Sequence, residues 1–154
     1  MAKPSIAFLG LGIMGSGMAN RLLGAGFKVA VYNRNAEKAK PLAEAGAKVA
    51  ATPREAAKGA GVVISMVADD AAARAVWLGE NGALAGAKKG AVLVESSTIT
   101  PEWVGELGEA AARHGCALLD APVTGTKPHA AAGELTFLVG GEAAALEKAR
   151  PALA

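Results

Sequence analysis

Short apolar runs recur along the 154 residues of the chain, and longer amphipathic or glycine-rich stretches separate them. Runs of this length predict strands, and their nearly uniform apolar character is typical of strands buried on both faces of a parallel sheet. The predicted strands cover residues 6–9, 28–32, 48–50, 62–66, 91–94 and 117–121, with a further strand within 133–141. Strands alternating with helical stretches predict an α/β fold: a Rossmann-type, doubly wound, mostly parallel sheet with helices on both faces.

Helix signals fill the stretches between the predicted strands. Met14, Met18 and Leu22 recur at i, i+4 and i+8, a stripe expected to lie on the sheet. A hydroxyl residue followed by proline, as in Thr52-Pro53 and Thr100-Pro101, is typical of a helix N-terminus. Further helices are expected over 36–45, through Trp77 with Asp69 or Asp70 as the N-cap, and over 142–150 at the end of the chain. The helix that starts at Thr100 is expected to end near His114, with that histidine at its C-terminal cap, and residues 81–90 are expected to form a loop.

The first strand runs directly into a glycine turn that opens the first helix. Residues 10–15 read GLGIMG and match the pattern G-x-G-x-x-G. In this pattern the first glycine allows the tight turn, the second lets a pyrophosphate approach the main chain, and the third lets the helix pack against the strand. The unpaired N–H groups and the dipole of the helix favour a diphosphate at that end. The predicted dinucleotide contacts here are Gly10, Leu11, Gly12, Ile13, Met14 and Gly15.

The end of the second strand indicates which dinucleotide is bound. An acidic residue about 20 positions beyond the glycines would bind the 2′-hydroxyl of NAD, but this chain has Asn33 followed by Arg34. A guanidinium pairs well with a 2′-phosphate, which a carboxylate would repel. Lys38, one helical turn on, adds a second positive charge. The predicted cofactor is therefore NADP(H), with contacts from Arg34 and Lys38.

Two other interpretations of the opening stretch stay open. Residues 4–20 carry no charge and follow Lys3, as in a signal peptide, although glycines interrupt the apolar core and the run is shorter than a bilayer span. The glycine turn could also be structural, with no ligand. The net charge of +2 with scattered Lys and Arg argues against a nucleic-acid surface. We expect no membrane association, no metal site, a cytoplasmic location, and a buried, unreactive Cys116.

Polar residues that follow the later strands form a second candidate site. In open α/β sheets, ligands lie beyond the carboxyl ends of the strands. Val67 and Ala68 follow the fourth strand and are predicted cofactor neighbours, and the fifth strand delivers ESST, residues 95–98, to the same edge. The loop with Thr124, Gly125, Thr126 and Lys127 offers donors that could bind a carboxylate, or it is an ordinary loop.

Together these motifs resemble the β-hydroxyacid dehydrogenase family, which includes 3-hydroxyisobutyrate dehydrogenase and glyoxylate/succinic semialdehyde reductase. The resemblance rests on GLGIMG at 10–15, VYNR at 31–34, ESST at 95–98 and DAPVTGTKPHAAAGEL at 120–135. It implies that the 2′-phosphate end of the cofactor is held by Asn33, Arg34, Asn35 and Lys38. It further implies that Val67, Ala68 and Thr98 line the cofactor near the nicotinamide. It also implies that Ser97 and the loop of Thr124, Gly125 and Thr126 hold the carboxylate or hydroxyl of a small hydroxy acid or aldehyde acid.

The resemblance also implies a part that these residues do not match. Members of the family continue into an all-helical domain, whose lysine donates a proton to the substrate oxygen and through which homo-oligomers form. No lysine here matches that motif, so residues 1–154 resemble a lone NADP-binding domain with no catalytic residue of its own. Two alternatives remain: a dinucleotide-binding or interaction module that does not catalyse, and a relative of the imine reductases, which share the fold.

Overall fold

The computed structural model describes residues 4–67, 69–97, 100–120, 123–124, 136–137 and 149, and for Ile13 and the four residues of the last two strands it describes the backbone alone. The helices are α1 (Ile13–Gly24), the 3₁₀ helix η1 (Ala36–Ala39), α2 (Lys40–Glu44), α3 (Pro53–Ala57), α4 (Asp70–Trp77), α5 (Ala83–Gly86) and α6 (Pro101–Arg113). The strands are β1 (Ile6–Leu9), β2 (Val29–Tyr32), β3 (Lys48–Val49), β4 (Val62–Ser65), β5 (Val92–Glu95), β6 (Ala117–Asp120), β7 (Val123–Thr124) and β8 (Thr136–Phe137).

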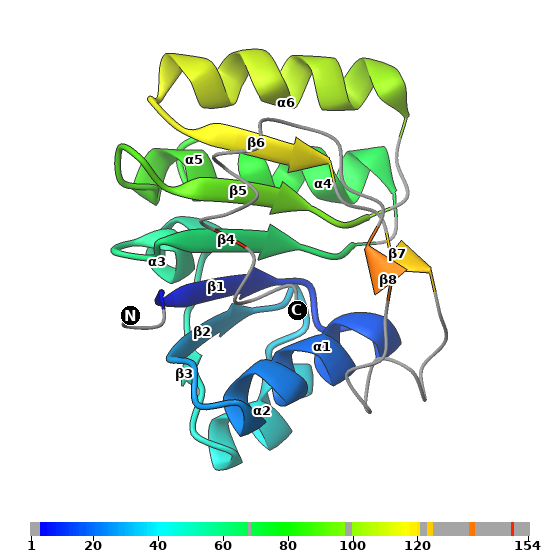
Figure 1. The fold of residues 1–154 in the computed structure, drawn as a ribbon. Helices are drawn as coiled ribbons and strands as arrows, with labels where there is room; N and C mark the ends of the chain where they lie inside the picture. Colours follow the sequence, from blue (N-terminus) through cyan, green and yellow to red (C-terminus); the bar gives the residue numbers. More distant parts are fainter. Residues whose placement is uncertain are drawn as a thin grey trace.

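Six of the strands form one parallel sheet in the order β3-β2-β1-β4-β5-β6 (Figure 1). β7 and β8 pair antiparallel in a separate two-stranded sheet. The chain adds strands on one side of β1 and then returns to add β4, β5 and β6 on the other side. This reversal creates a crevice at the carboxyl ends of β1 and β4, the place where open α/β sheets bind ligands. The predicted Rossmann-type fold is confirmed.

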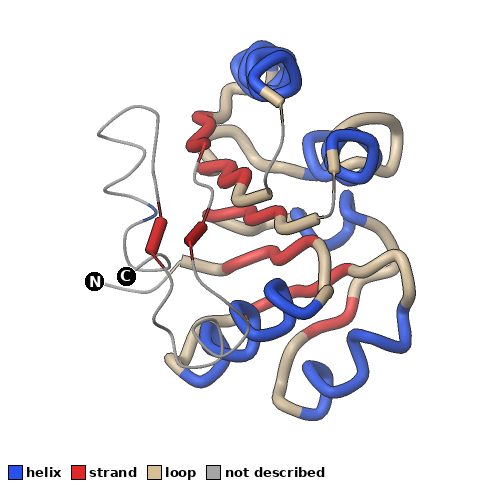
Figure 2. Tube along the Cα trace, turned by 90° about the vertical axis from the view of Figure 1, so that its right-hand side faces the viewer, coloured by secondary structure: helices blue, strands red, loops and turns tan. Residues whose placement is uncertain are grey.

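Helices cover both faces of this sheet, as Figure 2 shows from the carboxyl ends of the strands. α1 and α2 pack on one face, where Met18, Leu22 and Leu42 join the core residues of the strands. α3, α4, α5 and α6 pack on the other, around the two buried tryptophans Trp77 and Trp103. Strands covered on both faces bury every position, and all residues of β1, β4 and β5 are buried.

The local signals read from the sequence explain most helix ends. Thr52 accepts a hydrogen bond from the N–H of Glu55, Asp69 from that of Ala72, and Thr100 from that of Trp103. These bonds satisfy backbone donors that a helix N-terminus leaves unpaired. His114 Nδ1 lies 3.0 Å from the carbonyl oxygen of Ala110, as expected for a residue at the C-terminal cap. Cys116 is buried, as predicted.

Two expectations for helices need correction. The helix predicted over 36–45 starts as η1 and becomes α-helical only at Lys40, because Pro41 has no N–H for the bond that a continuous α-helix requires. The loop predicted over 81–90 contains the short helix α5. α5 lies tightly against the start of α3, since a Cβ on Gly86 would come 2.1 Å from the carbonyl oxygen of Arg54.

Candidate functional site

The glycine turn joins β1 to α1 at the crevice, and two of its glycines are required by packing. Gly10 has a φ of +99°, and a Cβ there would lie 2.3 Å from the carbonyl oxygen of Met66. A Cβ on Gly15 would lie 2.0 Å from the carbonyl oxygen of Gly10. Neither position has room for a side chain, so these two glycines bring α1 and the residues after β4 against the turn.

Gly12 differs from its two neighbours in the motif. Its φ is −69°, which any residue adopts, and a Cβ built on it meets nothing within 4 Å. The protein's own packing therefore gives no reason for a glycine at this position. A ligand lying against the main chain does give one, because a side chain would occupy the space that a pyrophosphate needs.

The N-terminus of α1 is prepared for an anion. It has no side-chain cap and no acidic residue in its first turn. The two other described helices of eight residues or more, α4 and α6, each have a side-chain cap and an acidic residue in the first turn. Free N–H groups and the positive end of the helix dipole thus face the open space at Gly12 without a neutralising carboxylate. The residues of this turn fit a diphosphate.

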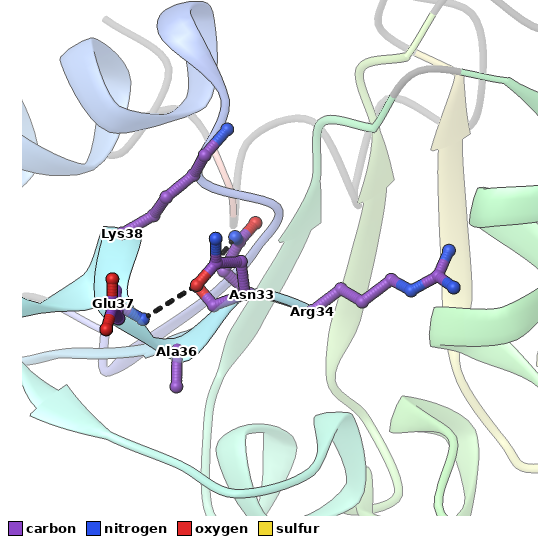
Figure 3. A pocket seen from close by; sticks show the side chains of 6 residues that line it. Asn33, Arg34, Ala36, Glu37 and Lys38 are labelled. Atoms are coloured by element: carbon purple, nitrogen blue, oxygen red, sulfur yellow. Dashed lines mark hydrogen bonds between the residues drawn. The ribbon is translucent and has the colours of Figure 1, made fainter.

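Asn33, at the end of β2, braces the glycine turn. Its side-chain oxygen accepts a hydrogen bond of 2.8 Å from the N–H of Leu11, and its amide nitrogen donates to the carbonyl oxygen of Asn35 at 2.9 Å. Asn35 in turn accepts a bond from the N–H of Glu37, drawn dashed in Figure 3. The sequence pointed to position 33 by its spacing from the glycines, but gave no signal for this cross-link between residues 22 positions apart.

A cleft of about 970 Å³ extends from the glycine turn to α4 and to the loop after β2. Arg34 and Lys38 both line it, and both are exposed. In Figure 3 their side chains extend in different directions from the loop, so the two positive charges do not converge on one point. The described residues that line the cleft are Gly10, Gly12, Met14, Gly15, Tyr32, Asn33, Arg34, Lys38, Met66, Val67, Asp69, Ala71, Ala72, Ala75 and Val76.

The second group of predicted residues lies where β4 and β5 end. Ser97 is buried, and its Oγ accepts a 2.8 Å hydrogen bond from the N–H of Val67 in the cleft wall. Glu95 is also buried, a feature that the sequence analysis missed. Burial raises the pKa of the Glu95 carboxyl, and hydrogen bonds from Ser97 and Trp77 oppose that rise. Burial likewise raises the pKa of Asp120 at the end of β6.

Several predicted site residues cannot be placed. Ala68, Thr98, Gly125, Thr126 and Lys127 lie outside the described residues, and for Thr124 in β7 only the backbone is described. Within the described part of the chain, no three His, Cys, Asp or Glu side chains group in a way that could hold a metal ion. In the same part, none of the helices combines the length and apolar character needed to cross a bilayer.

Comparison with known proteins identifies the family. A family model described as the NAD binding domain of 6-phosphogluconate dehydrogenase matches residues 5–154. The chain belongs to this family. The predicted resemblance to the β-hydroxyacid dehydrogenases is confirmed with it, since the similar proteins include several dehydrogenases of that kind.

Two relatives come from Pseudomonas aeruginosa. An NAD-dependent L-serine dehydrogenase is 46% identical to the chain over 146 residues, which are 95% of the chain and 49% of the relative. A 3-hydroxyisobutyrate dehydrogenase is 44% identical over 148 residues, which are 96% of the chain and 50% of the relative. The chain therefore spans about half the length of the curated relatives it matches.

Several solved structures share this fold. The 3-hydroxyisobutyrate dehydrogenase of Mycobacterium tuberculosis with L-serine has a TM-score of 0.92 and 38% identity, covering 99% of this chain and 51% of that one. Psf3 in complex with NADP+ has a TM-score of 0.91 and 34% identity, covering 96% and 52%. An imine reductase from a Pseudomonas species has a TM-score of 0.86 and 29% identity, covering 99% and 52%.

Proposed function

We propose that residues 1–154 form the dinucleotide-binding part of an NADP(H)-dependent oxidoreductase. The whole enzyme would transfer hydride between the nicotinamide and a small 3-hydroxy acid or aldehyde acid, such as a semialdehyde or glyoxylate. The observation that carries the proposal is the glycine turn, where Gly12 has room for a side chain that it lacks and faces an uncapped helix N-terminus. An uncapped helix N-terminus with open space before it suits a bound diphosphate, which supports the proposal.

The preference for NADP(H) over NAD(H) is part of the proposal. In it, Arg34 holds the 2′-phosphate with support from Lys38, and Asn33 with Asn35 shapes the loop that carries them. Position 33 is an amide rather than a carboxylate, so the loop places no negative charge there against a phosphate. Similar proteins are named for NAD and for NADP+, so the preference has to be tested directly.

The substrate is proposed to lie where β4 and β5 end, beside the nicotinamide. Val67, Ala68 and Thr98 would line the nicotinamide, while Ser97 with Thr124, Gly125, Thr126 and Lys127 would hold the substrate carboxylate and hydroxyl. The names of the relatives support a small hydroxy acid, because they specify serine and 3-hydroxyisobutyrate. Hydride transfer to a carbonyl also needs a proton donor. By family resemblance that donor is a lysine of a helical domain, so we propose that this chain alone binds NADP(H) without appreciable turnover.

The test is calorimetric titration of the chain with NADPH and NADH, repeated on Arg34→Ala. Loss of a charge-assisted contact to a phosphate is expected to weaken NADPH binding by about 10- to 100-fold, with NADH binding nearly unchanged. Arg113→Ala is the matched control, because Arg113 is an exposed arginine at the end of α6 that does not line the cleft. Equal binding of NADPH and NADH by the unmodified chain would refute the preference, and binding of neither would refute the proposed function.

The similarity to an imine reductase supports a second candidate, reduction of an imine with the bound nicotinamide cofactor. Such a reaction needs no site for a substrate carboxylate. Consumption of NADPH should be followed with a semialdehyde and with a cyclic imine in parallel. Turnover of the imine alone would favour this candidate, while tight NADPH binding with turnover of neither fits a cofactor-binding part that acts with the rest of an enzyme.

A further inference from the structure

The buried carboxyl of Glu95 at the end of β5 has no part in the proposed function so far. It is 0% exposed, and a carboxyl in the core is costly unless its oxygens are hydrogen-bonded. Here each oxygen accepts one bond. Oε2 accepts from Trp77 Nε1 at 2.8 Å, and Oε1 accepts from the backbone N–H of Ser97 at 3.0 Å. Glu95 therefore ties the last residue of α4 to the segment that follows β5.

Ser97 continues this link into the wall of the cleft. Its Oγ accepts the N–H of Val67, and Val67 lies against the glycine turn, since a Cβ on Gly10 would come 2.8 Å from Val67 Cγ1. Glu95 thus reaches the wall of the cleft twice: through Ser97 to Val67, and through Trp77 to α4, whose Ala72 and Val76 line the same cleft. These contacts join residues that lie far apart in the sequence.

The direction of the bond to Val67 also sets what Ser97 can do. The hydroxyl oxygen accepts the backbone N–H of Val67, and the Ser97 side chain is also hydrogen-bonded to the Glu95 carboxyl, which lowers the pKa of that carboxyl against the rise caused by burial. A hydroxyl can accept one bond and donate another at the same time. The Ser97 side chain therefore links Glu95 directly to the wall of the cleft.

We propose that Glu95 is a positioning residue of the dinucleotide site, acting through Ser97 and Val67 to fix the cleft wall where β4 and β5 end. This inference rests on the proposed function for the ligand, but the link itself is a property of the free chain. The alternative is that Glu95 stabilises the core and has no effect on the cleft.

Three variants separate the links. Glu95→Gln keeps the shape and burial of the side chain but turns one oxygen into a donor, which then faces the N–H of Ser97 or of Trp77. Trp77→Phe removes the indole donor together with part of a fully buried ring, and Ser97→Ala removes the hydroxyl that bonds Val67 and Glu95. Ser96→Ala is the matched control, because Ser96 Oγ is buried in the same segment and has no partner among the described residues. If Glu95→Gln does not fold, Trp77→Phe and Ser97→Ala carry the comparison.

The first readout needs no ligand. In the free chain, Glu95→Gln and Ser97→Ala should each shift the backbone amide resonance of Val67 by NMR, whereas Ser96→Ala should leave it in place. Since Trp77→Phe keeps the bond from Ser97 to Glu95, it should shift Val67 less than Glu95→Gln does. An unchanged Val67 resonance in both Glu95→Gln and Ser97→Ala would overturn the proposal, whatever nucleotide the chain binds.

The second readout is NADPH affinity, measured well below the melting temperature of each variant. We expect Glu95→Gln and Ser97→Ala each to weaken binding by about tenfold, the worth of one hydrogen bond to a ligand. The double variant should bind NADPH no more weakly than whichever single variant binds it less tightly, because the two substitutions interrupt the same link. Fully additive losses would refute the link through Ser97, and unchanged affinity with a lowered melting temperature would make Glu95 a core residue only. If the unmodified chain binds no nucleotide, the proposed function fails and Glu95 has no dinucleotide site to position.

Discussion

Alanine substitutions at Gly12 and Gly15 should affect the protein in opposite ways. Both glycines belong to the same turn, but only Gly15 is crowded by the protein itself. An alanine Cβ at position 15 would lie 2.0 Å from the carbonyl oxygen of Gly10 and 3.3 Å from Phe8 Cε1, whereas at position 12 it would meet nothing within 4 Å. The pair therefore separates the demands of packing from those of a ligand.

The expected changes in stability follow from these distances. Alanine at position 12 reduces the conformational entropy of the unfolded chain, which stabilises the folded protein by about 0.4–1 kcal/mol. It is a poorer N-cap than glycine, which offsets a gain of that order and leaves the free energy of unfolding within about 1 kcal/mol of the unmodified value. At position 15 the clash is with backbone, which cannot rotate away. Overpacking of this kind costs about 1–3 kcal/mol or more, so we expect Gly15→Ala to destabilise by at least about 2 kcal/mol.

Nucleotide binding should separate the two variants further. A methyl group on residue 12 would displace a diphosphate from the N–H groups of α1, and each hydrogen bond lost to a charged group is worth about 1.5–3 kcal/mol. Gly12→Ala should therefore weaken NADPH binding by about 10- to 100-fold or more. Gly24→Ala is the control, because Gly24 also has open space, at the other end of α1.

The assays are urea unfolding for stability and calorimetry for affinity, at one temperature and salt concentration. The reasoning would be refuted if Gly12→Ala bound NADPH as tightly as the unmodified chain. It would be refuted equally if Gly12→Ala lost as much stability as Gly15→Ala, because glycine at position 12 would then be a structural requirement.

Three further predictions follow from the hydrogen bonds. Asn33→Asp keeps the acceptor for Leu11 but loses the donor to Asn35 and adds a negative charge, so by calorimetry the preference for NADPH over NADH should fall by about tenfold; an unchanged preference would count against a 2′-phosphate here. Thr100→Val should lower the free energy of unfolding by about 1 kcal/mol by urea titration, because the helix loses its N-cap, whereas Thr100→Ser should retain it. The folded-state pKa of Glu95 is raised above its usual 4.5, so stability from its protonated form is complete below about pH 4.5 and is lost as the pH rises through the raised pKa. Urea unfolding measured from pH 4 to 7 should show the unmodified chain losing free energy of unfolding relative to Glu95→Gln. A difference in unfolding free energy between the two that stays constant with pH would contradict this.

Local signals in the sequence were sufficient for the sheet and for most helix ends. The predicted strands appear because apolar runs of only a few residues between breakers are too short for a helix of ordinary length and bury well in a sheet covered on both faces. The caps at Thr52, Asp69 and Thr100 depend on a side chain and an N–H three residues away. Contacts of this range are visible in a sequence, since both partners lie within one helical turn.

The cross-links at the site could not be read in the same way. Asn33 bonds a residue 22 positions away, and Glu95 bonds a tryptophan 18 positions away. Neither partner is marked by spacing or periodicity, because the contact exists only once the sheet has brought separate loops to one edge. Nothing in the sequence marks Glu95 as buried, and only the fold shows that it is enclosed and bonded to Trp77 of α4.

The most direct test of the central claim is to locate NADP+ on the chain by NMR. Backbone amide resonances should be followed during titration with NADP+ and, separately, with NAD+. We predict that the largest shifts with both ligands occur at residues 12–15, and that residues 34–38 shift with NADP+ far more than with NAD+. Shifts confined to other regions, or the absence of any shift at millimolar NADP+, would contradict the assignment of this turn as a dinucleotide site.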